Sequence, residues 1–221
     1  NASPEAVEAA RQRSFSLGEN FVMSNAWWGD PVVLGRYPEG AEARFGADMY
    51  RLTDAEWALV SSPLDFYGFN VYQGTATMPP PRDGYDEYAF QGSPRTSFQW
   101  NLTPEALYYC PKFLFERYRL PLIITENGMS NLDWVALDGQ VHDPQRIDFL
   151  RRYLRELRRA TDEGIDILGY TYWSFMDNFE WASGYDIRFG LVYVDYRTQA
   201  RTVKDAGHWY RGVIESNGAA L

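Results

Sequence analysis

Glu126 is the residue whose position in this sequence most favours chemistry, because its carboxylate directly follows an apolar, β-branched run. That run, residues 121–125 (PLIIT), is typical of a buried strand. A carboxylate just past a buried strand is poorly solvated, so it needs hydrogen-bonding partners or a chemical task. Two interpretations stay open from this residue alone: Glu126 caps the following turn, or it takes part in catalysis.

Asn70 and Tyr72 end a second apolar run, residues 64–72, which fits a buried strand of a parallel sheet. The carboxyl ends of parallel strands gather at one edge, and the loops that follow them hold functional groups. Taken alone, Tyr72 also fits a core ring whose hydroxyl is satisfied locally.

Residues 172–181 (YWSFMDNFEW) interleave two indoles with Asp, Asn and Glu after a third apolar run. Packing of a core does not require that mixture. A sugar site does, since indole faces stack on the C–H faces of a pyranose and carboxylates accept its hydroxyl hydrogens. The segment therefore favours carbohydrate as the ligand.

Composition narrows the function further. The sequence has 30 acidic and 21 basic residues, a net charge of −9, which argues against nucleic acid or an anionic membrane as partner. One cysteine, Cys110, and two histidines, His142 and His208, leave little for a metal site, and we expect neither metal nor cofactor.

Two features bear on where the protein works. The sequence contains no apolar run near the roughly 18–20 residues of a membrane helix, and no signal peptide opens it. We expect a cytoplasmic protein without a membrane partner. Because the chain begins at Asn1, we also expect a processed product or a piece of something longer.

The elements that must position these groups alternate between strand and helix, which predicts an α/β fold with a parallel sheet and crossover helices. The predicted strands are residues 65–71, 97–100, 122–125 and 166–173. A closed eight-stranded barrel takes about 250 residues, and this chain has half the strands. Residues 73–96, rich in Pro and Gly, are predicted to be a long loop.

Three helical signals stand out. Thr53 and Glu56 form a capping box that opens a short helix through Val60. Residues 144–163 carry apolar side chains at steps of three and four and end at Gly164. A last helix is expected near 203–216, after a short β-ribbon arm at 191–194.

Several blocks resemble glycoside hydrolase family 1, the β-glucosidase family. They are ITENG at 124–128, LDFYGFNVY at 64–72, WSFMDNFEW at 173–181, GYDIRFGL at 184–191, and the closing stretches 143–150 and 201–209. The blocks lie in the family's order and cover essentially the whole chain, but only the C-terminal half of a member. The resemblance implies one half-barrel domain over 1–221, the last four βα units of a (β/α)8 TIM barrel.

The resemblance also implies roles. Glu126 would be the nucleophile that forms a covalent glycosyl-enzyme, and Tyr72 would hydrogen-bond its carboxylate. Trp100 would face the aglycone, and the Trp173-Ser174 peptide would be cis. The remaining matched positions would bind or line the glycone subsite: Asn70, Trp173, Glu180, Trp181 and Phe189.

Two departures limit what the chain can do alone. The family's Asn-Glu-Pro motif, which carries the acid/base glutamate, occurs nowhere in these 221 residues, and Val71 replaces a tyrosine of the second block. Retaining glycosidases use two carboxyl groups roughly 5–5.5 Å apart, and loss of acid–base help costs about 10²–10⁴-fold. Whether the single chain is an enzyme is therefore left open.

The leading hypothesis is a retaining β-glucosidase polypeptide acting on a β-glucoside or another neutral β-glycoside. Its barrel would be completed by an N-terminal half or by a second copy of the chain, because a half-barrel leaves open strand edges. The alternative is a non-catalytic remnant that binds carbohydrate or only associates with itself.

Overall fold

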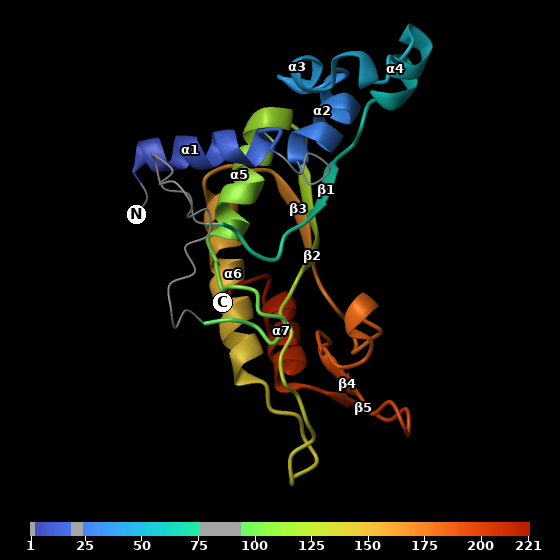
Figure 1. Cartoon of the computed structure of the whole chain (residues 1–221). Coiled ribbons are helices and arrows are strands. Elements are labelled where there is room, and N and C mark those ends of the chain that lie inside the picture. Colours follow the sequence, from blue (N-terminus) through green and yellow to red (C-terminus); the bar gives the residue numbers. More distant parts are fainter. Residues whose placement is uncertain (1–2, 19–23, 76–93) are drawn as a thin grey trace. The chain divides into compact units, whose positions relative to one another are not determined.

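The computed structural model describes residues 3–18, 24–75 and 94–221 of the chain (Figure 1). These residues form two compact units. Unit 1 is drawn from residues 1–65, 75–88 and 116–120, and unit 2 from residues 66–74, 89–115 and 121–221. Most of the predicted loop 73–96 lies outside the described residues.

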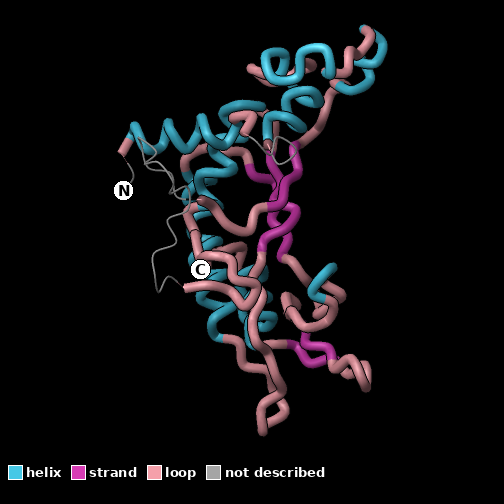
Figure 2. The backbone as a smooth tube through the Cα atoms, in the orientation of Figure 1, coloured by secondary structure: helices cyan, strands magenta, loops and turns pink. Residues whose placement is uncertain are grey.

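Unit 2 contains a parallel sheet of three strands in the order β1-β2-β3. Strands are magenta in Figure 2. The strands are β1 Tyr67–Asn70, β2 Leu122–Asn127 and β3 Ile167–Tyr172. Helix α5 (Ala106–Tyr118) lies between β1 and β2 in the sequence, and α6 (Pro144–Asp162) lies between β2 and β3. The predicted alternation of strand and helix is confirmed.

The core of unit 2 lies where the sheet meets these helices and α7 (Asp205–Glu215). The apolar stripe of α6 is buried as its spacing predicts, with Leu150 fully covered and Leu154 and Leu157 nearly so. They cluster with Ile124 of β2 and Leu107 of α5. This core anchors the strands whose carboxyl ends carry the polar candidate residues.

A two-stranded antiparallel arm follows the sheet. It pairs β4 (Val192–Val194) with β5 (Arg201–Val203), which confirms the ribbon predicted at 191–194. The arm connects the aromatic segment after β3 to the first turn of α7.

The strand predicted at residues 97–100 is wrong. These residues form a turn in which the Thr96 backbone N–H donates to Trp100 O at 2.9 Å, and the Gln99 N–H donates to Thr96 O at 2.9 Å. Gln99 has a φ of 64°, which a strand cannot accommodate. The Ser97 and Phe98 N–H groups donate to Ser130 O and Ser130 Oγ, at 3.3 and 2.9 Å, and not to a neighbouring strand.

Unit 1 is helical in its described residues. Its helices are α1 Pro4–Phe15, α2 Asn25–Leu34, α3 Ala41–Phe45 and α4 Asp54–Val60. The capping box predicted at the start of α4 is present. The Thr53 hydroxyl oxygen accepts from the Glu56 N–H, and the Glu56 carboxylate accepts from the Thr53 N–H. In α2, the buried Asp30 is paired with Arg117 and accepts from the Tyr118 hydroxyl at 3.0 Å.

No helix within the described residues is long and apolar enough to cross a membrane. The assignment of the whole chain to one domain of four βα units stays a prediction.

Candidate active site

Glu126 and Tyr72 meet at the carboxyl ends of β1 and β2. The two strands are parallel neighbours, and Asn70 lies opposite Glu126 in the register. Beyond it, the Val71 N–H donates to Glu126 O at 2.9 Å, and the Asn127 side-chain amide donates to Val71 O at 2.7 Å. This backbone pairing aims Tyr72 at the carboxylate, and its hydroxyl donates to Glu126 Oε2 at 2.7 Å.

The Tyr72 phenol stays protonated, and so remains a hydrogen-bond donor, across the pH range in which proteins are folded. Burial, and after it the hydrogen bond to Glu126, raises the pKa of Tyr72 well above its ordinary value. The Glu180 carboxylate also contributes to this rise in the pKa, so it is electrostatically close to the pair. A protonated phenol on a carboxylate oxygen is a charge-assisted hydrogen bond, among the stronger kinds in proteins.

Asn70 lies on the exposed side of the same strand end. Its Oδ1 accepts from the Thr125 hydroxyl at 2.7 Å, so the residue before Glu126 fixes the orientation of the amide. Thr125 was not singled out from the sequence, since a threonine within a β-branched strand looks like an ordinary strand former.

The aromatic segment after β3 brings Trp173 and Glu180 together. The Trp173 Nε1–H donates to Glu180 Oε2 at 3.3 Å, and the Trp173-Ser174 peptide bond is cis, as the resemblance implied. Trp181 follows in a 3-10 turn and is 82% exposed. An indole left this open is available to a ligand or a partner surface.

Phe189 and Trp100 form an aromatic wall around Tyr72. The Trp100 ring lies 4.9 Å from the Tyr72 ring, and the Phe189 ring lies 6.2 Å from it in an edge-to-face arrangement. Phe189 is 2% exposed, so it supports the Tyr72 ring from behind. The wall also contains Phe98, 4.7 Å from Trp100, which the sequence placed in a strand and gave no role.

Five charged residues that the sequence left without a role are buried beneath this segment. We call them the buried ion cluster: Asp133, Asp143, Arg146, Asp177 and Lys204, each with a side chain that is 0% exposed. Asp143 was expected to be a helix cap or a surface group. Its carboxylate makes no capping bond to α6 and instead accepts from the Ala206 N–H of α7 at 2.8 Å.

The electrostatics of the cluster follow from its burial. Burial, and after it the Arg146 guanidinium, lowers the pKa of Lys204, although the carboxylates of Asp133 and Asp177 act in the opposite direction. Burial would raise the pKa of Asp133, but Arg146 and Lys204 outweigh it and lower that pKa. Burial raises the pKa of Asp143.

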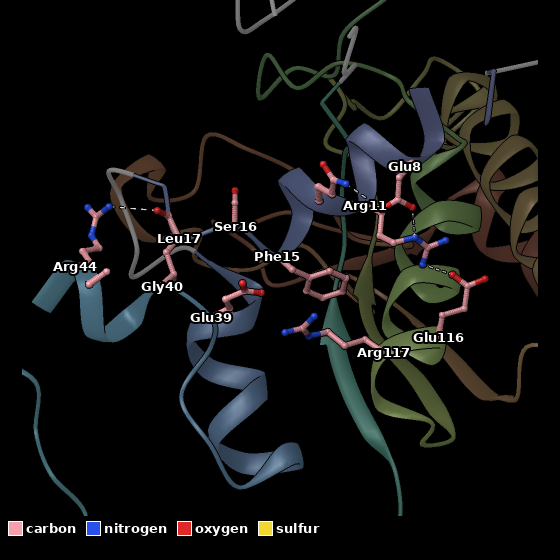
Figure 3. A pocket seen from close by; sticks show the side chains of 12 residues that line it. Glu8, Arg11, Phe15, Ser16, Leu17, Glu39, Gly40, Arg44, Glu116 and Arg117 are labelled. Carbon is pink, nitrogen blue, oxygen red and sulfur yellow. Dashed lines mark hydrogen bonds and ion pairs between the residues drawn. The ribbon is translucent and has the colours of Figure 1, made fainter. Parts of the chain in front are cut away.

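A separate hollow of about 800 Å³ lies in unit 1 (Figure 3). It is lined by charged side chains that pair with one another: Arg11 is ion-paired with Glu116 and with Glu8, and Arg117 lies over the Phe15 ring. Part of its charge is paired within the lining, Arg44 donates to Leu17 O at 3.2 Å, and we assign the hollow no chemistry. Within the described residues, no group of three or more His, Cys, Asp or Glu could hold a metal ion.

Comparison with known proteins decides the family. The profile of glycosyl hydrolase family 1 matches residues 2–219, nearly the whole chain. The chain belongs to glycosyl hydrolase family 1.

Two of the relatives that the chain matches are named beta-glucosidase A. Beta-glucosidase A of Thermotoga maritima is 39% identical over 194 residues, which cover 86% of this chain and 43% of the relative. Beta-glucosidase A of Acetivibrio thermocellus is 36% identical over 221 residues, covering 97% of this chain and 48% of the relative. The chain therefore spans about half the length of the curated relatives it matches.

The fold agrees with the family assignment. The solved family 1 β-glucosidase from Thermotoga maritima superposes with a TM-score of 0.80 and 34% identity over 98% of this chain and 48% of that one. The same enzyme has been solved in complex with castanospermine and with glucoimidazole. The predicted fold class, half of a family 1 TIM barrel, is confirmed.

Proposed function

We propose that this chain is the nucleophile-bearing half of a retaining β-glucosidase, with Glu126 as the nucleophile. The observation that carries the proposal is the 2.7 Å hydrogen bond from the Tyr72 hydroxyl to Glu126 Oε2 at the ends of two neighbouring parallel strands. It holds one carboxylate oxygen and leaves the other to attack.

The reaction proceeds in two displacements. A Glu126 oxygen bonds to the anomeric carbon as the bond to the leaving oxygen breaks, and a second carboxyl group protonates that oxygen. The second group, now a carboxylate, deprotonates a water molecule, which attacks the same carbon and releases Glu126. The Tyr72 hydroxyl holds the free Glu126 carboxylate in position for the first attack.

The remaining site residues bind the glycone. Glu180 accepts hydroxyl hydrogens of the sugar, and the Trp173 indole N–H, 3.3 Å away, fixes the orientation of that carboxylate. Trp181 offers an exposed ring face, and Asn70 offers an amide beside Glu126. Trp100 faces the aglycone, and Phe189 closes the subsite behind Tyr72.

A neutral β-glycoside, a β-glucoside first, is the substrate class that fits these groups. Relatives named β-glucosidases at 36–39% identity support that choice. Carboxylates and indoles suit a neutral hexose, whose hydroxyls donate to the former and whose C–H faces lie on the latter.

The acid/base carboxyl group comes from outside this chain. Asn-Glu-Pro does not occur in the sequence, and Glu180 is the carboxylate that we assign to the hydroxyls of the glycone. Within the described sheet, β1 and β3 each pair on one side only, so two strand edges can accept further strands. We infer that residues 1–221 supply the last four βα units, and that an N-terminal half or a second copy supplies the rest.

Covalent trapping tests the proposal directly. An activated 2-deoxy-2-fluoro-glucoside needs no proton on its leaving group, so it can label the nucleophile even where the acid/base group is missing. We expect mass spectrometry to find one fluoroglucosyl group on the peptide that contains Glu126, and none in Glu126→Gln. Glu163→Gln, a change at a carboxylate outside the site, should label like the unaltered chain.

The experiment is run on the chain alone and after mixing with the complementary half of the Thermotoga maritima relative. Absence of labelling in both samples contradicts the proposal. Sugar binding without labelling would instead favour the non-catalytic, carbohydrate-binding alternative.

A further inference from the structure

The buried ion cluster joins four segments of unit 2 that are far apart in the sequence. Asp133 lies in the loop after β2, Asp177 in the aromatic segment after β3, and Lys204 directly before α7. Asp143 and Arg146 lie at the start of α6. Two of these segments carry the candidate site: Glu126 precedes Asp133 by seven residues, and Glu180 follows Asp177 by three.

Lys204 is the link between the two loops. Its Nζ donates to Asp133 Oδ2 at 2.6 Å and to Asp177 Oδ1 at 2.8 Å, and all three side chains are 0% exposed. Arg146 supports the arrangement by donating to the same Asp133 oxygen at 2.7 Å and to Arg188 O at 3.1 Å. One ammonium group thus fixes the separation of two carboxylates on two different loops.

Asp177 in turn holds the aromatic segment together. Its carboxylate accepts from Gly190 N at 3.0 Å and from Arg188 Nη1 at 2.5 Å, besides Lys204. Gly190 must be a glycine for this, because a Cβ there would lie 2.2 Å from Asp177 N. The stretch between Asp177 and Gly190, which contains Glu180 and Trp181, is therefore a loop closed at its base.

The two loops also touch through their backbones. The Asn131 N–H donates to Arg188 O at 3.1 Å, so the chain after Glu126 pairs directly with the closed base of the aromatic segment. The Tyr172 hydroxyl lies between the same two loops, 3.4 Å from Met129 O and 3.0 Å from Phe189 O, and the charged side chains reinforce these contacts.

Stability alone does not account for this cluster. Burying ions costs several kcal/mol each, and well-packed apolar side chains often stabilise a core as well as a buried ion pair does. Charged groups differ from apolar ones in being directional, since each hydrogen bond fixes a distance and an angle. A cluster placed beneath two loops that carry a site is suited to fixing their separation.

We propose that Lys204 and Asp177 are positioning residues that hold the Glu126 loop and the Glu180 loop at the spacing one sugar ring requires. The sugar-binding role in this inference rests on the proposed function. The clamp, by which we mean the hydrogen bonds of Lys204 to Asp133 and Asp177, can be tested without substrate. Neither residue touches the sugar. They act through the loops that they join.

Lys204→Met tests the clamp, because it removes the ammonium group and keeps the stem. We expect amide hydrogen exchange to rise at least tenfold in residues 128–133 and 174–190, with exchange in residues 147–157 of α6 unchanged. We also expect the folded protein to bind deoxynojirimycin at least tenfold more weakly, in the chain alone and mixed with the complementary half. A role in stability alone would reduce the folded fraction and leave that affinity unaltered.

Two further variants keep the test decisive. Asp133→Asn preserves volume and an acceptor oxygen, so it should fold even if Lys204→Met does not, and should loosen the same two loops to a smaller degree. Arg211→Met removes an exposed ion pair with Glu215 on α7 and should change neither measurement.

Unchanged exchange in both loops overturns the inference, as does a rise spread evenly over α6 and the loops. If the unaltered chain binds no deoxynojirimycin in either sample, the proposed function fails. The exchange pattern then still decides whether Lys204 clamps the loops.

Discussion

At the scale of single residues, the site depends on one hydrogen bond between a phenol and a carboxylate. Tyr72 is held by the aromatic wall of Trp100 and Phe189, and Glu126 is held by the backbone of β2. Packing and strand pairing, rather than side-chain flexibility, bring the two groups together. The pair is therefore preorganised, as the role proposed for Glu126 as nucleophile requires.

Tyr72→Phe should slow the trapping of Glu126 by a fluoroglucoside by about 10- to 100-fold, since a hydrogen bond to a charged group contributes about 1.5–3 kcal/mol. The ring keeps its packing, so the free energy of unfolding should fall by no more than about 1.5–3 kcal/mol, the contribution of the lost hydrogen bond. Rates measured by mass spectrometry at several times give the comparison. Equal rates for the two proteins would show that the hydroxyl does not support the nucleophile.

At the scale of elements, the close approach of β2 and β3 at their carboxyl ends requires a glycine two residues after Glu126. The Trp173 N–H donates to Asn127 O at 2.9 Å, and a Cβ on Gly128 would lie 1.9 Å from Trp173 O. Since a backbone oxygen cannot move aside as a side chain can, the two strand ends would have to separate.

Gly128→Ala should therefore lower the free energy of unfolding by about 2–3 kcal/mol. Gly169→Ala is the matched control, because Gly169 lies in β3 with nothing within 4 Å of its added Cβ. That change should be neutral or stabilising by up to about 1 kcal/mol. Urea unfolding followed by tryptophan fluorescence measures both, and similar values for the two variants would contradict the steric argument.

His142 supplies a second link between elements, from the loop after β2 to the first residue of α7. Its ring nitrogens lie 2.7 Å from Asp205 Oδ2 and 3.0 Å from Asp138 Oδ2, and both nitrogens donate only when the ring is protonated. Asp205, and after it Asp138, raises the pKa of His142 above 6.5.

The folded protein thus binds this proton more tightly than the unfolded chain. The stabilisation is complete below pH 6.5 and is lost as the pH rises through the raised pKa. Between pH 6 and 9, the free energy of unfolding should fall with a slope that His142→Asn removes and His208→Asn retains. A slope that persists in His142→Asn would assign the effect to another group.

Elements with strong local patterns could be predicted from the sequence, and contacts between distant segments could not. The stripe of α6 and the capping box of α4 are patterns within one helix, and Glu126 follows a plain β-branched strand. Residues 97–100 were predicted wrongly because the aromatic run masks a turn closed by Thr96. Arg146 left one usable signal: it lies three and four residues before the buried Phe149 and Leu150, on the apolar side of α6.

At the scale of the whole molecule, the chain has the length of half a family 1 enzyme and an incomplete sheet. The chain covers 48% of the solved Thermotoga maritima relative, and the described sheet ends at β1 and β3. Apolar side chains are exposed beside these edges, with Leu168 at 57% and Phe66 at 46%. Open edges with exposed apolar neighbours favour association with other strands.

We accordingly expect self-association when the complementary half is absent. Light scattering on a size-exclusion column at micromolar concentration should give at least twice the mass of one chain. Leu168→Glu, which places a charge on the β3 edge, should shift the population toward single chains without unfolding unit 2, whereas Leu59→Glu, at an exposed position in α4, should not. A compact single chain at micromolar concentration would contradict the pairing, because it would show that the edges are stable uncovered.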